Sequence, residues 1–163
     1  MRKISKTAIG VGVFVALLIA AGYSMKANAT ENQFHIGVGK TVINSHLKVG
    51  EVGYIHNNWD FEVSLMEAGD TKRGYQDNEV MYSVSYITEP SWGIYGIDPY
   101  FKLGVSANSG HTLVGDTNFR LGVGLDFHDV WRIEYVHHSS AGIHDPNTGV
   151  DYVKIDYLID PFW

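Results

Sequence analysis

Residues 131–163 read WRIEYVHHSSAGIHDPNTGVDYVKIDYLIDPFW, and the alternation in this stretch decides the fold. Large apolar residues recur at every second position in two runs, and the segment between the runs is rich in Gly, Pro, Asn and Asp. Such a pattern predicts two antiparallel β-strands joined by a turn-rich loop. Since side chains alternate between the faces of a strand, one face of this hairpin carries Trp131, Ile133, Tyr135, His137, Ser139, Asp151, Val153, Ile155, Tyr157 and Ile159.

Three polar residues, His137, Ser139 and Asp151, lie at one end of this apolar face. They would be misplaced on the core face of a soluble protein, because buried polar groups are costly unless they are paired. They are readily accommodated if the apolar face contacts lipid. The hairpin therefore favours a barrel whose outer wall faces a membrane.

The rest of the chain repeats the alternation in six earlier segments: 34–39, 47–56, 59–66, 80–86, 95–105 and 119–127. Short turns and longer polar loops, the latter over 67–77 and 107–116, separate these segments in alternation. Pro99 lies inside the fifth segment, which indicates a bulge or a strand that is not fully paired there. An even number of alternating strands with unequal loops is typical of outer-membrane proteins. The predicted fold is an eight-stranded antiparallel transmembrane β-barrel.

A soluble sandwich or lipocalin-like barrel would show the same alternation, with its apolar face turned inward. The aromatic end of the chain at Trp163 and the export signal described below favour the membrane version. Its interior would be just filled by side chains, so inward charges should pair across the lumen. The inward charged residues are Asp60, Glu62, Arg120, Asp126, Arg132 and Glu134, and inward glycines at 37, 39, 122 and 124 relieve crowding.

The N-terminus carries the pattern of a secretory signal peptide. Basic residues at 2, 3 and 6 precede an apolar run over 8–21 and the sequence Ala27-Asn28-Ala29. This pattern predicts cleavage after Ala29, which leaves residues 30–163 as a single barrel domain. The alternative, an uncleaved membrane helix, would need about 20 apolar residues.

Composition excludes several classes of function. The chain has no cysteine, so no disulfide framework supports the exported domain. Its net charge of −6 argues against nucleic acid as a partner. The eight histidines do not show metal-ligand spacing on a shared element, so we expect neither a metal nor another cofactor.

His137, Ser139 and Asp151 are the residue types of a nucleophilic triad. His137 and Ser139 are two apart, so they emerge on one face with Cα atoms about 7 Å apart. Antiparallel pairing can bring Asp151 beside His137. The alternative is that these residues, with His138 and Ser140, are polar groups at the membrane rim.

The segment WRIEYVHHSSAGIHDPNTGVDYVKIDY resembles the C-terminal signature of the outer-membrane lipid A 3-O-deacylases, the PagL family. The family pattern is a strand ending in His-x-Ser-Asn-Ala, a loop with Pro-Asn and Gly, and an acidic residue opening the last strand. The resemblance implies that His137 is the general base, Ser139 the nucleophile and Asp151 the acid. Asn147, in the matching loop with Gly149, is similar to an asparagine assigned to the oxyanion hole.

Two positions depart from the family pattern. Ser140 stands where the family has Asn, a residue linked to oxyanion stabilisation, and its hydroxyl is the donor that remains for this supporting role. Asp151 replaces the more common Glu and is one methylene shorter. His138 as the base and Asp145 as the acid are weaker alternatives, and His144 lies in the connecting loop, where it could touch a lipid headgroup.

The leading hypothesis is an esterase that removes the 3-position acyl chain of lipid A on the lipid-facing barrel wall. Its expected partners are lipid A, or whole lipopolysaccharide, and the surrounding outer-membrane lipid, with a homodimer as a further option. The alternative is a non-catalytic small outer-membrane barrel with a structural or binding role, in which the loops 67–77 and 107–116 contact a partner. A soluble periplasmic lipid carrier is a third, more distant hypothesis.

Overall fold

The computed structural model describes residues 30–90, 92–110, 112–143 and 147–160. The predicted signal peptide, His144, Asp145 and the terminal Trp163 lie outside these ranges. The described residues contain no helix that is both long enough and apolar enough to cross a membrane.

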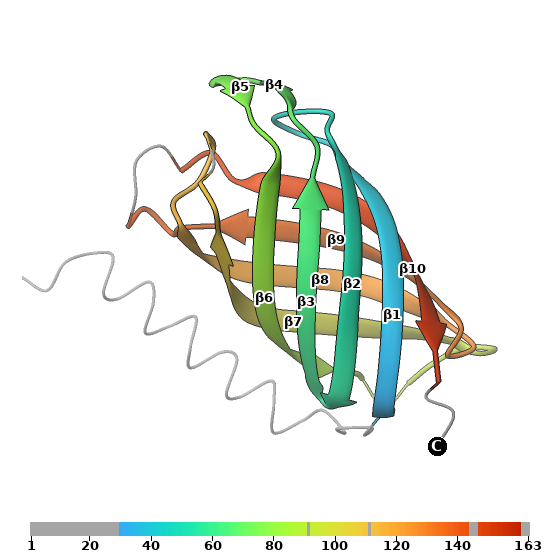
Figure 1. The fold of residues 1–163 in the computed structure, drawn as a ribbon. Helices are drawn as coiled ribbons and strands as arrows, with labels where there is room; N and C mark the ends of the chain where they lie inside the picture. Colours follow the sequence, from blue (N-terminus) through green and yellow to red (C-terminus); the bar gives the residue numbers. More distant parts are fainter. Residues whose placement is uncertain (1–29, 91, 111, 144–146, 161–163) are drawn as a thin grey trace, which may run out of the picture.

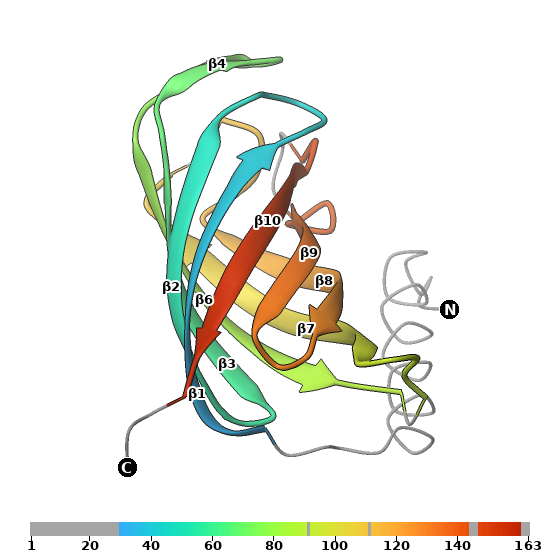
Figure 2. The same cartoon turned by 90° about the vertical axis from the view of Figure 1, so that its right-hand side faces the viewer.

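Eight antiparallel strands close into a barrel in the order β1-β10-β9-β8-β7-β6-β3-β2 (Figures 1 and 2). The barrel strands are β1 Thr30–Thr41, β2 Lys48–Asn57, β3 Trp59–Met66, β6 Glu79–Thr88, β7 Ile97–Asn108, β8 Thr117–Phe127, β9 Trp131–Ser139 and β10 Val150–Ile159. Closure pairs both edges of the sheet, with β1 registered against β10 from Phe34↔Ile159 to Thr41↔Tyr152. The predicted fold class is confirmed.

The predicted polar loop over 67–77 has a structure of its own. It folds into a two-stranded sheet of β4 Gly69–Thr71 and β5 Gly74–Gln76, which projects beyond the barrel (Figure 1). Periodicity did not predict this hairpin, because three-residue strands are too short to show alternation.

The two ends of the barrel differ. One end carries the turn at Asn58 and the connections 89–96 and 128–130. The opposite end, at the upper left of Figure 1, carries the connections 42–47, 67–78, 109–116 and 140–149. In outer-membrane barrels the short turns are periplasmic and the longer loops extracellular, so the second end is the one that would face outward in such a protein.

The predicted alternation of faces is observed along the barrel strands. In β3, for example, Trp59, Phe61 and the following odd-numbered residues are exposed, whereas the even-numbered residues are buried in the lumen. Tyr95, the first residue of the predicted segment 95–105, does not belong to a strand. It is exposed and lies in the turn before β7, with a positive φ of 55°. Pro99 lies within β7 at a position where only β8 is paired, since the β6–β7 register ends at Phe101. A missing N–H is tolerated there.

The lumen is filled by paired charges, as predicted. Arg120 is fully buried, with Nη2 2.7 Å from a Glu62 oxygen and 3.0 Å from a Glu134 oxygen. At the short-turn end of the barrel, Arg132 Nε lies 2.6 Å from Asp126 Oδ2. Lys102 adds a further buried cation, and its Nζ lies 2.5 Å from Asp60 Oδ2. These pairs make the interior a packed polar core.

The inward glycines provide the space that these large side chains need. A Cβ atom added at Gly37 would collide with the Asp156 carboxylate, and one added at Gly124 would collide with the Tyr100 ring. Tyr100 is itself completely buried and donates a hydrogen bond to Glu134. Glycine at these positions therefore relieves crowding, as expected.

Candidate active site

The register of the closing hairpin places His137 directly opposite Asp151 on the outer wall. His137 Nδ1 lies 2.7 Å from Asp151 Oδ1. With Asp151 ionised, Nδ1–H donates this hydrogen bond, which leaves Nε2 as the ring nitrogen able to take a proton. The His137 side chain is 38% exposed and that of Asp151 is 6% exposed, so the acid is covered while the base stays accessible. The shorter acid therefore reaches the base.

Tyr135 is a member of this cluster that sequence reasoning did not single out. Its hydroxyl donates a hydrogen bond of 2.5 Å to Asp151 Oδ1, the oxygen that also accepts from His137. Tyr135 lies two residues before His137 and so shares its face of β9. The signal was present in the sequence, because a phenol at that spacing can reach an acid that faces His137, but Tyr135 also fits a lipid-facing aromatic position.

Ser139 has different neighbours in this structure. Its Oγ donates to Asn147 Oδ1 at 3.3 Å and accepts a hydrogen bond from the Ala141 N–H at 3.2 Å. Within the described residues, no hydrogen bond joins Ser139 to His137. The fold thus brings His137 and Asp151 into contact and places Ser139 beside Asn147 on the same wall.

Asn147 holds the start of the loop after β9. Its Oδ1 accepts hydrogen bonds from Ser139 Oγ and from the Ser140 backbone N–H, the latter at 3.0 Å. Because both donors converge on one oxygen, the amide nitrogen of Asn147 is the end that remains able to donate. Among the described residues, this nitrogen has no hydrogen-bond partner.

Ser140 faces the other way. Its side chain is buried, and within the described part of the chain its Oγ has no hydrogen-bond partner. Ser139 lies on the outer face, so the two hydroxyls point to opposite sides of the strand end. The contact of Ser140 with Asn147 is made by its backbone, and the supporting role of its hydroxyl stays a prediction.

Two loops from other parts of the barrel hold the segment before Asp151. Asn44, in the β1–β2 connection, donates from Nδ2 to Thr148 O at 2.7 Å and to Gly149 O at 3.1 Å. The Thr148 N–H donates to Leu113 O, in the β7–β8 connection, at 2.9 Å. These contacts join residues more than 30 positions apart, which is why the sequence did not reveal the positioning role of Asn44.

Gly149 is needed at the base of the site. Its φ is +77°, in the left-handed region that favours glycine. A Cβ atom added there would lie 2.9 Å from His137 Cε1 and 3.4 Å from Asp151 Oδ2. The glycine predicted from the loop motif thus lies directly against the histidine–aspartate pair.

His138, the alternative base, faces the lumen as expected and is buried. Its Nδ1 lies 2.8 Å from Ser106 Oγ, and its ring stacks on Tyr152 with centroids 5.8 Å apart. These contacts keep it away from the outer wall, where the other candidates lie.

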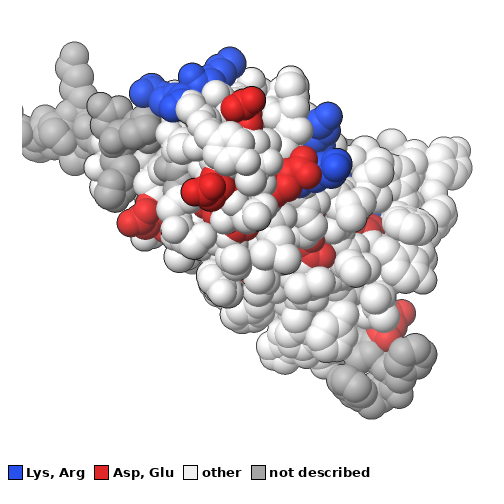
Figure 3. Space-filling model, turned by 45° about the horizontal axis from the view of Figure 1, so that its top comes forward, with Lys and Arg blue, Asp and Glu red and all other residues white. Residues whose placement is uncertain are grey.

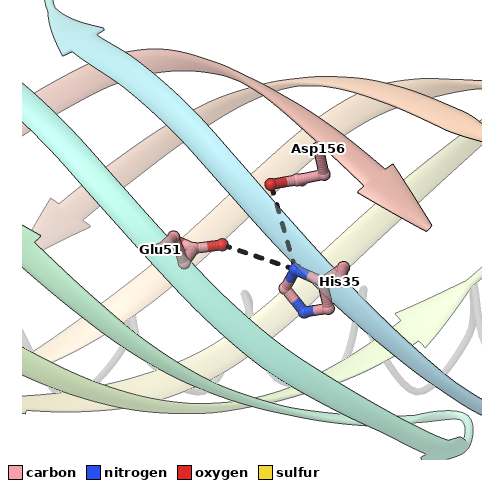
Figure 4. A group of neighbouring side chains, drawn as sticks. All are labelled: His35, Glu51 and Asp156. Atoms are coloured by element: carbon pink, nitrogen blue, oxygen red, sulfur yellow. Dashed lines mark ion pairs between the residues drawn. The ribbon is translucent and has the colours of Figure 1, made fainter. Parts of the chain in front are cut away.

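Two overlapping groups of lumen residues have the geometry to hold a metal ion, namely His35 with Glu51 and Asp156, and His35 with Asp60 and Glu62. Figure 4 shows the first group, in which His35 Nδ1 is 3.9 Å from an oxygen of each acid.

Lys154 already lies among these acids. Its Nζ pairs with Glu51 and lies 3.1 Å from Asp156 Oδ2 and 2.9 Å from Glu62 Oε1. A metal ion next to this ammonium would be repelled. The group is better explained as part of the lumen ion-pair network.

Comparisons with known proteins identify the family and agree with the fold. The model of the family described as lipid A 3-O-deacylase (PagL) matches residues 33–159, which span the barrel. No curated protein matches the sequence. Among solved structures, the crystal structure of the outer membrane enzyme PagL is similar, with a TM-score of 0.57, 23% identity, and coverage of 79% of this chain and 99% of that chain.

The N-terminal β-barrel domain of Pseudomonas aeruginosa OprF is also similar, with a TM-score of 0.53, 16% identity, and coverage of 79% of this chain and 98% of that chain. At these identities the two likenesses show the fold alone. The family match extends over most of the chain, and on this basis the chain, an outer-membrane β-barrel, belongs to the lipid A 3-O-deacylase (PagL) family.

Proposed function

We propose that the protein hydrolyses the ester that links the 3-position acyl chain to lipid A, with Ser139 as nucleophile, His137 as base and Asp151 as the acid that orients it. The family is one of lipid A deacylases, which supports ester hydrolysis as the reaction class. The observation that carries the residue assignment is the 2.7 Å hydrogen bond between His137 and Asp151, formed on the outer wall two residues from Ser139.

The reaction would proceed by acyl transfer to the serine. Ser139 Oγ attacks the ester carbonyl carbon while its proton passes to His137 Nε2. The tetrahedral intermediate then collapses, and the 3-oxygen of the sugar leaves with the proton from His137. Water, activated by the same histidine, cleaves the acyl-enzyme and releases the fatty acid. Asp151 holds the imidazole in the tautomer with the proton on Nδ1 and stabilises the imidazolium.

Ser139 must turn toward His137 for this chemistry. The Cα atoms of residues two apart on a strand are separated by about 6.6–6.8 Å, so rotation about χ1 can bring Oγ toward Nε2. Catalytic hydrogen bonds are often long or absent without substrate and tighten in the complex. The present contact of Ser139 with Asn147 is compatible with such a resting arrangement.

The oxyanion would be held by donors from the loop after β9. The free amide nitrogen of Asn147 is the candidate that lies nearest to Ser139, given the contact between its Oδ1 and Ser139 Oγ. The loss of one oxyanion donor typically costs about 10²–10³ in kcat. Asn147 is therefore expected to matter more than the inward hydroxyl of Ser140.

The location of the site fits a lipid substrate. His137, Ser139 and Asp151 lie where β9 ends and β10 begins, at the end of the barrel with long loops. That end corresponds to the outer leaflet, where lipid A resides. The substrate would approach laterally along the wall, so the reaction needs no pocket inside the barrel.

The test is Ser139→Ala, compared with Ser109→Ala, which removes a hydroxyl from an exposed loop position. Lipid A from cells expressing each variant is analysed by mass spectrometry, and heat-modifiable gel migration reports folding. We expect Ser109→Ala to release the 3-position chain and Ser139→Ala to release none, because loss of a triad nucleophile costs about 10⁶-fold. A folded Ser139→Ala protein that still deacylates would overturn the assignment. A wild-type protein without activity would favour the non-catalytic barrel.

A further inference from the structure

A hollow lies on the outer wall, on strands that take no part in the candidate active site. It has a volume of about 530 Å³ and is lined by residues of β1, β2, β3 and β6. Its floor is Gly50, which faces outward and has no atom within 4 Å of the position that a Cβ would take. The volume lies within the range of about 300–1,000 Å³ typical of small-molecule sites.

The hollow is apolar, and a single row of registered residues, one from each of four neighbouring strands, lines it. Gly50 is registered directly opposite Val38 on one side and Leu65 on the other, and Leu65 is opposite Val80. Because Gly50 has no side chain, the side chains on either side of it are highly exposed, Val38 to 69% and Leu65 to 60%. This row is a groove that an extended acyl chain can fill.

Two lysines lie directly above this groove. Lys40 and Lys48 are registered opposite each other on β1 and β2, two residues nearer to the long loops than Val38 and Gly50. Like charges directly opposite on neighbouring strands repel each other, so the arrangement costs stability unless an anion lies between them. Lys48 has a partner in Glu67 at 3.5 Å, whereas Lys40 has no ion pair among the described residues.

The arrangement of the two lysines above the apolar groove matches one kind of ligand. The cations lie at the outer-leaflet end and the apolar groove about 7 Å below them, two residues along each strand. Figure 3 shows charged side chains gathered at this end, with the wall below largely uncharged. A lipid with a phosphate on its headgroup and an acyl chain beneath satisfies both features. In the outer leaflet, beside an enzyme of this family, that lipid is lipid A.

We propose that Lys40, Lys48 and the groove over Gly50 form a second, non-catalytic binding site for a phosphate and one acyl chain of a lipid A molecule. The site lies on β1, β2, β3 and β6, whereas His137 and Ser139 lie on β9 and Asp151 on β10, so it differs from the candidate active site. The inference rests on lipid A as the surrounding lipid and does not depend on the triad.

The experiment uses solution NMR of the folded Ser139→Ala protein in zwitterionic micelles, titrated with bis-phosphorylated lipid A. The backbone amides of Gly39, Gly50 and Met66 report on the groove, and that of His137 reports on the candidate active site. We expect saturable shifts at the groove amides, and weaker binding with lipid A from which the phosphates have been removed.

Two independent variants test the site. Lys40→Gln combined with Lys48→Gln should raise the dissociation constant seen at the groove amides roughly 30-fold, at about tenfold per 1.4 kcal/mol and about 1 kcal/mol for each cation. Gly50→Leu should abolish the groove shifts by filling the hollow, and the space around its Cβ predicts that the barrel still folds.

The controls are Lys72→Gln, an exposed cation on the hairpin formed by β4 and β5, and Val105→Leu, an exposed apolar position on β7 that does not line the groove. Both should bind as the parent protein does. The proposal is overturned if the groove amides do not saturate, if removal of the phosphates changes nothing, or if Lys72→Gln weakens binding as much as the double variant. Each of these outcomes is independent of the hydrolysis test, because binding is measured in a protein that lacks the Ser139 hydroxyl.

Discussion

Asp151→Asn is the substitution that most directly probes the proposed chemistry. It preserves the size of the side chain and one oxygen acceptor, but it removes the negative charge 2.7 Å from His137 Nδ1. It also weakens the acceptor of the Tyr135 hydroxyl, which lies 2.5 Å away. A hydrogen bond to a charged group contributes about 1.5–3 kcal/mol, and the amide can in addition favour the wrong imidazole tautomer.

The expected result is a fall in kcat of about 10²–10⁴-fold, which corresponds to about 2.7–5.4 kcal/mol of transition-state stabilisation. The lower value applies if only the charge is lost, and the upper value if the tautomer also changes. The assay measures the rate of fatty acid release from lipid A in mixed micelles by mass spectrometry. Asp70→Asn, an exposed position on the hairpin of β4 and β5, controls for the change in net charge.

The reasoning would be refuted if folded Asp151→Asn kept more than about a tenth of the wild-type rate. In that case the histidine–aspartate contact would be structural, and another base would have to be sought. If Asp70→Asn lost as much activity, the effect would reflect net charge at the membrane surface rather than the contact with His137.

Three further predictions concern the surroundings of this pair. Tyr135→Phe removes one of the two donors to Asp151 and should lower the rate by a smaller factor, about tenfold, with stability within about 1 kcal/mol of wild type by urea unfolding. Gly149→Ala should lower the rate of lipid A hydrolysis, because a Cβ at positive φ would press on His137, and an unchanged rate would show that the loop can shift freely. Arg120→Met leaves two buried carboxylates without this partner and should destabilise the barrel by about 3–5 kcal/mol, whereas a change below 1 kcal/mol would mean that the lumen lysines compensate.

Several features of the molecule were determined by the sequence itself. Period-two alternation decided both the strand type and the face of each residue, because successive side chains of a strand must point to opposite sides. Parity puts the apolar side chains on one face and the charged side chains and His138 on the other, and the export signal and the aromatic end of the chain favoured the version in which the apolar face meets lipid. Parity also put Asp151 on the same face as His137, whereas the register that pairs the two directly was given by the structure.

The tertiary structure decided what depends on contacts between distant segments. Periodicity could not show that Asn44 holds the carbonyls of 148 and 149, because that hydrogen bond joins loops of different hairpins. Periodicity also could not show whether Tyr135 binds Asp151 or only contacts lipid, because both roles place its side chain on the outer face of β9.

The Ser139 hydroxyl points toward Asn147 because it donates a hydrogen bond to that residue of the loop after β9, and the sequence does not show this rotamer. The groove at Gly50 exists only because the register of four neighbouring strands sets Val38, Gly50, Leu65 and Val80 side by side. The chain thus encodes which face each residue occupies through local geometry, whereas the neighbours on that face are selected by register and by barrel closure.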